Sequence, residues 1–345
     1  MNTSERLPAV VVGAGKWAHE YWVPFLHRQR VLTVVAVADI HAPARASLAT
    51  HLNGVATFTT LEHAVAHLPQ LTVAVILTSP ESHAELITTA HRLGLDVITE
   101  KPAATNLDDL RLLRGLPPDY RAVVCQNYRY EAHIQTLRNR LRAGDLGQVR
   151  SVHARFAADY RQPGSWDVGD AHTMVHPMLL EGSIHHLDMM RYLTGADITR
   201  VVTSAHNPPG SSFVGHALVH CLLEFTDGTL GTYEASLLCA GREQRWHHEY
   251  YRLECDNGAI ECDGWQVRIL RGTHVEPVET TGDPSRRDGH LDILAQYQRW
   301  RHGGPVAETA LADNLHSLAI VMAAIESAQT GGWCDVSSPR FPGDL

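Results

Sequence analysis

Short apolar runs alternate with amphipathic stretches over the first third of the chain. Runs rich in Val, Ile and Leu are expected to be strands buried on both faces, at residues 8–12, 32–38, 71–78, 96–99 and 121–125. Between them apolar residues recur at helical spacing, at residues 17–28, 42–52, 61–68, 82–93 and 107–113. This alternation predicts a doubly wound parallel sheet, the Rossmann arrangement, over residues 1–127.

The pattern changes after a predicted helix at residues 131–143. Apolar and polar residues then favour strands at residues 149–157, 198–206, 216–225, 230–238, 250–256, 259–261 and 266–271. Asp227-Gly228 and Asn257-Gly258 are typical of hairpin turns. Further helices are predicted at residues 181–193, 290–302 and 310–329. Residues 128–345 are therefore expected to form a second α/β domain with a large, mainly antiparallel sheet.

The composition limits the class of protein. The 345 residues are 44% hydrophobic and 7% aromatic, which fits a globular protein with a sizeable core. A net charge of −9 argues against a nucleic-acid or anionic-membrane partner. The first residues lack a signal-peptide pattern, and the first apolar run is too short to span a bilayer. Dispersed cysteines without a C-x-x-C pair then indicate reduced thiols and a cytoplasmic protein.

Gly13-x-Gly15-x-x-Ala18 follows a predicted strand and opens a predicted helix, the context that a dinucleotide fingerprint requires. Gly13 permits a tight turn, Gly15 lets the backbone approach a pyrophosphate, and Ala18 allows close helix packing. Asp39 ends the second strand about 20 residues further on, where a carboxylate binds adenine-ribose hydroxyls and repels a 2′-phosphate. Ile40 and His41 follow it instead of an arginine. NAD is therefore the predicted cofactor, with NADP disfavoured.

These residues belong to a series that resembles the Gfo/Idh/MocA oxidoreductases, the family of glucose–fructose oxidoreductase, inositol dehydrogenase and rhizopine catabolism proteins. The other members of the series are Thr78-Ser79-Pro80 with His83, Glu100-Lys101-Pro102, Asn127-Tyr128-Arg129-Tyr130, Gly144-Asp145-Leu146-Gly147 and Glu181-x-x-x-His185-x-x-Asp188. The resemblance implies an NAD-dependent dehydrogenase or reductase that acts on CH–OH groups of a sugar, cyclitol or related polyol. It also implies an open C-terminal sheet that builds a homo-oligomer, a dimer or a tetramer.

The resemblance assigns Lys101 to the nicotinamide and the substrate. The nicotinamide-ribose side would be lined by Thr78, Pro80, His83 and Glu100. The expected cofactor-binding set is completed by Lys16, Trp17 and Gln126. Lys16 and Lys101 are the two lysines of the chain. Lys16 is interpreted as a solvated cation near the pyrophosphate, whereas Lys101 is expected to take part in the chemistry.

Glu181 and His185 lie four residues apart on a predicted helix and therefore share one face. A carboxylate orients an imidazole and raises its basicity, which suits removal of a hydroxyl proton as a hydride leaves the same carbon. His185 is the predicted general base, and Lys101 would stabilise the developing alkoxide or relay the proton. The alternative is a surface ion pair. In the family an aspartate usually stands where this chain has Glu181, which reaches one methylene further.

The predicted small-molecule substrate is polyhydroxylated. Its expected contacts are Arg129, Tyr160, Trp166, His172 and His186, with packing or surface positions as the alternative for each. Asp188 is expected to be structural. Zinc ligand types also gather at His172, His176, Glu181, His185 and His186. Hydride transfer to NAD needs no metal, and none is predicted.

Two other functions are compatible with the same residues. Tightly bound NAD would also serve a redox-neutral reaction, in which transient oxidation permits epimerisation, elimination or glycoside cleavage with the same Lys101 and His185. A non-catalytic nucleotide-binding regulator is the third possibility, and the presence of Lys101, Glu181 and His185 disfavours it.

Overall fold

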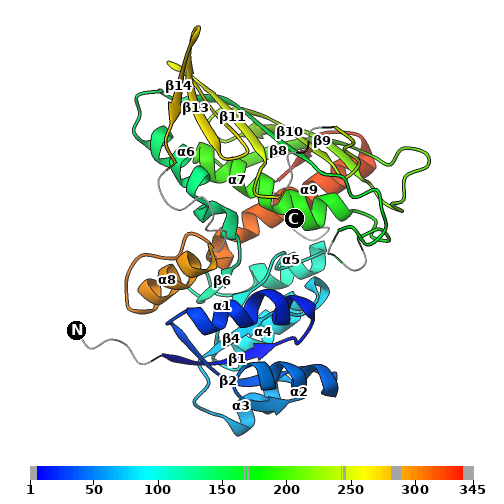
Figure 1. Ribbon diagram of the computed structural model, residues 1–345, viewed down its shortest axis with the longest axis vertical. Coiled ribbons are helices and arrows are strands. Elements are labelled where there is room, and N and C mark those ends of the chain that lie inside the picture. Colours follow the sequence, from blue (N-terminus) through cyan, green and yellow to red (C-terminus); the bar gives the residue numbers. More distant parts are fainter. Residues whose placement is uncertain are drawn as a thin grey trace, which may run out of the picture. The chain divides into compact units, whose positions relative to one another are not determined.

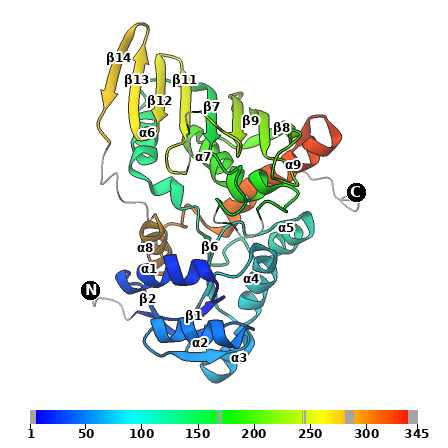
Figure 2. The same ribbon diagram turned by 45° about the vertical axis from the view of Figure 1, so that its right-hand side comes forward.

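The structure is a computed structural model that describes residues 6–336 apart from 167, 169, 170, 242, 244, 245 and 281–288. The chain divides into two compact units (Figures 1 and 2). The first comprises Met1–Cys125 and His290–Leu315, and the second comprises Gln126–Gly289 and His316–Leu345. This differs from the predicted division at residue 127, which assigns the whole C-terminal part to the second domain.

The segment His290–Leu315 belongs to the first unit because its side chains contact residues that are distant in the sequence. The His290 ring lies 5.4 Å from the Trp22 ring, centroid to centroid. The Tyr297 hydroxyl donates to Asp96 Oδ2 at 2.8 Å. Helical spacing shows which face of a segment is apolar, but it does not show which distant surface that face covers. The prediction therefore placed this segment with its neighbours in sequence.

The first unit contains a six-stranded sheet in the order β3-β2-β1-β4-β5-β6, and every pair in it is parallel. The strands are β1 (Leu7–Val12), β2 (Leu32–Ala38), β3 (Ala56–Phe58), β4 (Val73–Ile76), β5 (Asp96–Thr99) and β6 (Ala122–Val124). The prediction of a doubly wound parallel sheet is confirmed. The prediction does not include β3, because the three residues of that strand do not form an apolar run.

The helices of the first unit alternate with its strands along the chain, except for the last one, which belongs to the segment that begins at His290 (Figure 1). They are α1 (Val23–Arg28), α2 (Ala42–His51), α3 (Leu61–His67), α4 (His83–Arg92), α5 (Leu107–Arg114) and α8 (His290–Arg301). The predicted helix at residues 17–28 begins with a π-helical turn, η1 (Ala18–Trp22), directly after the glycines. Pro80–Ser82 forms a 3₁₀ turn, η2, before α4.

The second unit contains a nine-stranded sheet in the order β14-β13-β12-β11-β7-β10-β9-β8-β15. Its strands are β7 (Val149–Ala157), β8 (Ile198–His206), β9 (Leu218–Phe225), β10 (Leu230–Ser236), β11 (Tyr250–Cys255), β12 (Gly258–Asp263), β13 (Gln266–Arg271), β14 (His274–Val278) and β15 (Cys334–Asp335). The β7–β10 pair is parallel and the other pairs are antiparallel. The predicted mainly antiparallel sheet is confirmed, although β14 and β15 are absent from the prediction.

Helices α6 (Ala132–Arg142) and α7 (Ile184–Thr194) lie on one side of this sheet (Figure 2). The long helix α9 (Leu311–Thr330) follows in the chain. A π-helical turn, η4 (Met178–Ser183), precedes α7. Successive residues of a strand point to opposite faces of the sheet. On the face opposite to these helices, Leu222 and Leu230 are 51% and 60% exposed. This face therefore carries apolar area outside the core of the unit.

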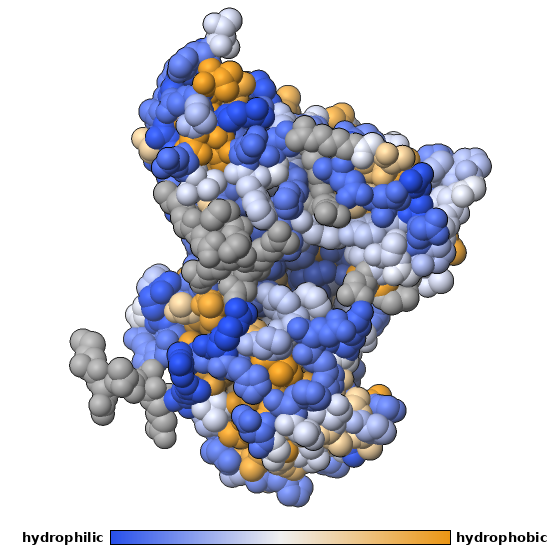
Figure 3. All heavy atoms as spheres, in the orientation of Figure 1, coloured by the Kyte–Doolittle hydropathy of each residue, from blue (hydrophilic) through white to orange (hydrophobic). Residues whose placement is uncertain are grey.

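Hydrophilic side chains predominate on the surface shown in Figure 3, and an apolar cluster lies over β13 and β14, where Val275 is exposed. Across residues 6–336, with the gaps given above, no helix combines the length and the apolar character needed to cross a bilayer.

Candidate active site

The glycine-rich turn in the first unit has the geometry that its sequence predicts. Gly13 has φ of +99°, and a Cβ added there would lie 2.6 Å from the backbone nitrogen of Thr78, so a larger residue does not fit. A Cβ added at Gly15 would meet none of the described atoms within 4 Å. Ala18 is fully buried at the start of η1. The turn thus packs closely against the residues that follow β4 and leaves its backbone open at Gly15, which fits a pyrophosphate.

Asp39 fixes this turn from the end of β2. Its Oδ2 accepts a hydrogen bond from the Ala14 backbone nitrogen at 2.7 Å, and its Oδ1 accepts one from the His41 nitrogen at 2.7 Å. A carboxylate oxygen has two acceptor positions, so both oxygens can still receive a ribose hydroxyl. Arg45 lies at the same strand end, where its Nη1 donates to the Asp39 carbonyl oxygen at 3.1 Å.

Glu100 anchors the segment that follows the glycines. Its buried Oε1 accepts hydrogen bonds from the indole nitrogens of Trp17 at 3.0 Å and Trp22 at 2.8 Å. Burial by itself raises the pKa of this carboxyl. The hydrogen bond and charge of His290, together with the two indole hydrogen bonds, outweigh burial and lower the pKa to about 2. Glu100 is therefore a carboxylate that holds Trp17 and Trp22, and its predicted place beside the nicotinamide ribose stays a prediction.

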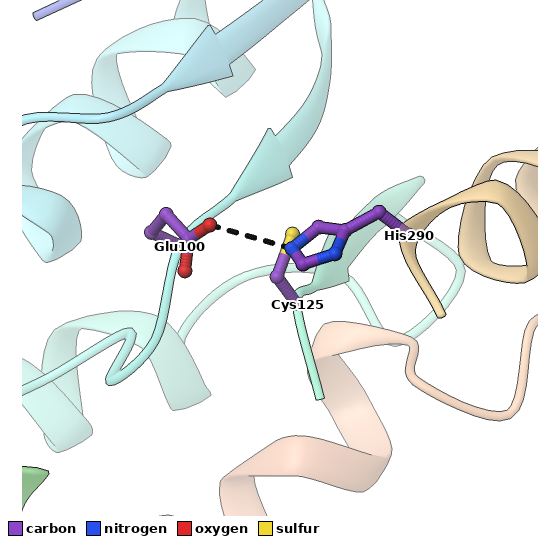
Figure 4. A group of neighbouring side chains, drawn as sticks. All are labelled: Glu100, Cys125 and His290. Carbon is purple, nitrogen blue, oxygen red and sulfur yellow. Dashed lines mark ion pairs between the residues drawn. The ribbon is translucent and has the colours of Figure 1, made fainter. Parts of the chain in front are cut away.

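Glu100, Cys125 and His290 form the group shown in Figure 4, with one ligand atom of each within 4.8 Å of the others. Among the residues that the structure covers, it is the group whose donors are near enough to share a metal ion. Two indole N–H groups already point at Glu100 Oε1. Burial, and secondarily the charge of Glu100, raises the pKa of the Cys125 thiol well above its usual value. Because metals bind the thiolate, this donor set fits a hydrogen-bonded core better than a metal centre.

Lys101 follows Glu100 directly, and the Lys101–Pro102 peptide bond is cis. His83 is fully buried beside this segment, with Nδ1 2.8 Å from the Pro102 carbonyl oxygen and Nε2 2.9 Å from the Thr78 carbonyl oxygen. His83 thus ties the end of β4 to the chain that carries Lys101. Lys16, by contrast, is 61% exposed and lies 3.8 Å from Glu20 Oε2.

In the second unit, His185 is buried near the start of α7 and its Nδ1 lies 3.0 Å from Gln126 Oε1. Because an amide oxygen is an acceptor, Nδ1 is the donor in this bond. The neutral imidazole then has its lone pair on Nε2, the nitrogen that can accept a proton. The Tyr128 ring stacks on the imidazole with centroids 4.4 Å apart and an interplanar angle of 11°. His185 therefore has the tautomer and the fixed orientation that a general base requires.

Sequence spacing did not identify Gln126 as the residue that orients His185. The two are 59 positions apart, and the prediction gave that role to Glu181. Glu181 lies in η4, a π-helical turn, so the regular α-helical spacing used for that prediction does not extend across it. The orienting role of Glu181 stays a prediction.

Arg129 is 4% exposed, and its Nε and Nη2 donate to Asp188 at 2.7 and 2.6 Å. Ser317 Oγ donates to the same carboxylate at 2.6 Å. Asp188 thus has the structural position expected of it. The guanidinium of Arg129 is bound to a buried carboxylate, and the predicted contact of Arg129 with the substrate stays a prediction.

Three of the expected substrate contacts come together in the structure. His172 Nε2 lies 2.9 Å from the Tyr160 carbonyl oxygen, and the rings of Tyr160 and Trp166 stack with centroids 5.3 Å apart. His186 is almost fully buried, with Nδ1 2.7 Å from the Tyr233 hydroxyl oxygen. It is linked to the other three through Trp246, whose ring lies 5.7 Å from the His186 ring and 6.0 Å from the Trp166 ring. Their role toward a substrate stays a prediction.

The histidines considered for a metal have different partners. His172 stacks on Phe213, with centroids 4.1 Å apart, and His176 lies beside His216 at 5.2 Å. Within the described segments they do not form a group of three donors near enough to share an ion.

His247 and Glu131 are two residues of the second unit that the sequence did not indicate. His247 Nδ1 is hydrogen-bonded to Glu131 Oε1, and the imidazole ring lies 4.6 Å from the Tyr128 ring. Glu131 is 116 positions away from His247, and the chain has 23 histidines. A single histidine in such a composition carries no signal.

Comparison with known proteins agrees with both units. The profile described as "Oxidoreductase family, NAD-binding Rossmann fold" matches residues 7–116, and that of the GFO/IDH/MocA C-terminal domain matches residues 134–261. The uncharacterized protein y4oX of Sinorhizobium fredii is 28% identical over 93% of this chain and 93% of its own length. The scyllo-inositol 2-dehydrogenase (NAD(+)) of Bacillus subtilis is 28% identical over 49% of each chain. The solved structure of a levoglucosan dehydrogenase in complex with NADH has a TM-score of 0.81 against this chain, with 18% identity over 96% of this chain and 99% of the other.

Proposed function

Because the chain belongs to the Gfo/Idh/MocA family of oxidoreductases, we propose that it transfers a hydride between NAD and a secondary alcohol or ketone of a sugar, cyclitol or related polyol. The observation that carries this proposal is the fixed tautomer of His185, whose Nδ1 donates to Gln126 and whose Nε2 is the basic nitrogen. The names of the similar proteins, scyllo-inositol 2-dehydrogenase and levoglucosan dehydrogenase, support the substrate class.

The residues of the first unit would hold the cofactor. The open backbone at Gly15 receives the pyrophosphate, and the Asp39 carboxylate receives the adenine-ribose hydroxyls. When bound, NAD accepts the hydride from the substrate carbon or returns it. The negative charge of Asp39 favours NAD over NADP, which would place a 2′-phosphate beside it.

Two side chains would move the proton in this reaction. His185 Nε2 removes the hydroxyl proton as the hydride leaves, and the Lys101 ammonium donates a hydrogen bond to the same oxygen as negative charge develops on it. In the reverse direction His185 acts as the acid. Glu181 adds a carboxylate near the start of α7 that would favour the protonated imidazole.

A panel of polyols with NAD and NADP tests this function. The panel contains scyllo-inositol, levoglucosan and open-chain sugars, and each reaction is followed by absorbance of the reduced cofactor and by NMR of the product. We expect reduction of NAD with at least one member of the panel. Turnover to a new product without net NADH would instead favour the redox-neutral use of bound NAD. If no member of the panel gave either a reduced cofactor or a new product, the proposal would be contradicted.

We also propose that the outer face of the nine-stranded sheet builds a homo-oligomer. Leu222 of β9 and Leu230 of β10 are diagonal neighbours in the ladder and are both more than half exposed. Replacing both leucines with glutamate should convert an oligomer into a monomer, because it puts charge on the face that would be buried. The molar mass measured by light scattering would show this change. A wild-type monomer at micromolar concentration would contradict this proposal.

A further inference from the structure

Arg45 lies at the carboxyl end of β2, beside Asp39. It is in the first turn of α2, where its backbone nitrogen donates to the His41 carbonyl oxygen at 3.1 Å. Its guanidinium points back to the strand end, and Nη1 donates to the carbonyl oxygens of Asp39 at 3.1 Å and Ile40 at 3.3 Å. The positive charge of Arg45 is therefore held against the residue that carries the predicted ribose-binding carboxylate.

The carboxylate and the guanidinium are each bonded to backbone groups. Asp39 Oδ2 and Oδ1 accept from the backbone nitrogens of Ala14 and His41. A guanidinium has five N–H donors, and the two on Nη1 of Arg45 bond to the carbonyl oxygens. The other three, on Nε and Nη2, have no hydrogen-bond partner in the part of the chain that the structure describes. Arg45 is half-buried, and these donors are left for a ligand.

Local sequence does not point to Arg45. NAD is predicted because Ile40 and His41, and not an arginine, follow Asp39 directly. Arg45 is six positions from Asp39, and the first turn of α2 brings it back to the strand end. That turn lies wholly within the described segments and contains no acidic residue, so it supplies no counter-charge for Arg45. One carboxylate and one guanidinium therefore act together at this strand end.

A 2′-phosphate on the adenine ribose would meet both of these groups. Asp39 accepts the ribose hydroxyls of NAD and repels the phosphate of NADP. A guanidinium binds phosphate oxygens through charge-assisted hydrogen bonds, and its planar fork can hold two oxygens at once. In a doubly wound fold, an arginine near the ribose accommodates a 2′-phosphate. Asp39 and Arg45 thus favour different cofactors.

We propose that Arg45 is a second determinant of cofactor choice, which binds the 2′-phosphate of NADP through Nε and Nη2 and opposes the discrimination imposed by Asp39. The proposal rests on the proposed function, because it concerns the nucleotide that the first unit would bind. The enzyme then binds both nucleotides, NAD more tightly. Loss of the Asp39 charge leaves the guanidinium in place, and the preference passes to NADP.

Binding of the reduced nucleotides tests this proposal without turnover. The dissociation constants of NADH and NADPH are measured by the fluorescence of the bound nicotinamide at one ionic strength, because salt screens the charges involved. The readout is the ratio of the constant for NADPH to that for NADH, which a fraction of misfolded protein does not change. Calorimetry with adenosine 2′,5′-bisphosphate and 5′-AMP repeats the comparison without the nicotinamide, so that a change in the ratio is assigned to the 2′-phosphate.

Arg45→Gln is the decisive variant, made in the wild-type chain and together with Asp39→Asn. Glutamine retains N–H donors for the strand carbonyls but carries no charge. We expect Arg45→Gln to raise the ratio about tenfold, because a charge-assisted hydrogen bond to the phosphate is lost.

Asp39→Asn retains the shape of the side chain and should reverse the preference to NADPH, since the repelling charge is gone. Adding Arg45→Gln to it should raise the ratio again by about tenfold. Arg45→Lys should raise the ratio less than Arg45→Gln does, because a point charge still attracts a phosphate.

Arg92→Gln is the matched control. Arg92 is exposed in the last turn of α4, shortly before β5, and therefore lies at the amino ends of the strands. Its Nη2 donates to Thr89 Oγ1 at 2.8 Å. The substitution removes one positive charge from the first unit, as Arg45→Gln does, and should leave the ratio unchanged.

Three results would overturn the role of Arg45 while leaving the proposed function intact. They are an equal loss of NADH and NADPH binding in Arg45→Gln, a change of the same size in Arg92→Gln, and binding of NADH but not NADPH by Asp39→Asn. The first would show that Arg45 supports the strand end or the adenine and does not select the cofactor. If the wild type bound neither nucleotide, the proposed function would be overturned and the role of Arg45 with it.

Discussion

Side chains near the glycine turn and Lys101 bind mainly backbone and indole groups, whereas those around His185 bind other side chains. In the first unit, Asp39 accepts two backbone N–H groups and His83 bridges two carbonyl oxygens. In the second unit, His185 binds Gln126, His186 binds Tyr233, and His247 binds Glu131. A site whose hydrogen bonds are made with backbone groups requires specific residues at only a few positions, chiefly glycines and acids that are close in sequence. A network of side chains depends on residues that come from distant parts of the sequence.

This difference predicts that the chemistry of the second unit can be removed without loss of nucleotide binding. His185→Ala should lower kcat/KM about 10³-fold, since it removes a positioned general base. The dissociation constant for NADH, measured by fluorescence, should change less than about twofold. His220→Ala, at an exposed position on β9, is the control and should leave both quantities unchanged. Equal loss of NADH binding in His185→Ala would contradict the separation of roles.

The next prediction concerns the contribution of the Glu100 carboxylate to the stability of the first unit. The pKa of Glu100 is lowered from 4.5 to about 2, so its ionised form stabilises the fold fully above pH 4.5, and this contribution is lost as the pH falls towards 2. Glu100→Gln should therefore reduce the free energy of unfolding by on the order of 3 kcal/mol at pH 7. The difference from the wild type should shrink at pH 3, measured by urea unfolding.

Glu20→Gln is the control for that measurement. Glu20 is 60% exposed and pairs with Lys16 at 3.8 Å, so its replacement should change the free energy of unfolding by less than about 1 kcal/mol. A loss in Glu100→Gln that is the same at pH 7 and pH 3 would show that shape, and not charge, determines the role of Glu100.

The two lysines offer a matched pair within the first unit. Lys101→Arg should lower kcat about 10²-fold, because a guanidinium does not exchange its proton and has a different shape. Lys16→Arg should change kcat less than about twofold, since Lys16 is exposed and the substitution retains its charge. Steady-state kinetics on the same substrate measures both. Similar effects of the two substitutions would remove the special role assigned to Lys101.

Asp39 is expected to give the smallest effect. Asp39→Ala removes the acceptor for the ribose hydroxyls and the bond to the Ala14 nitrogen, and it should raise the KM for NAD about tenfold. The KM for NADP should fall relative to that for NAD, because the repelling charge is gone. Ile40→Ala, at an 88% exposed position, is the control. An unchanged ratio of the two KM values would contradict the role of Asp39 in cofactor choice.

Three features are predictable from the amino-acid sequence: the strand–helix alternation of the first unit, the glycine turn and the antiparallel character of the second sheet. Each of these depends on local signals: Gly13 needs positive φ, and β1 or β7 needs a continuous or alternating apolar run. The π-helical turn at Ala18–Trp22 falls within a predicted helix, and the turn at Met178–Ser183 overlaps the start of another. Hydrophobic spacing over a few residues does not distinguish a π-helical turn from an α-helical one.

The contacts between distant side chains follow from the packing of the folded chain and are not predictable from local sequence patterns. This packing returned His290–Leu315 to the first unit, gave Arg129 to Asp188, and made Gln126 the partner of His185. It also joined His247 to Glu131. These contacts link positions far apart in the chain, and the residues involved are common polar types without a local pattern. Periodicity specifies the face of an element, whereas packing of one element on another determines the partner that its side chains meet.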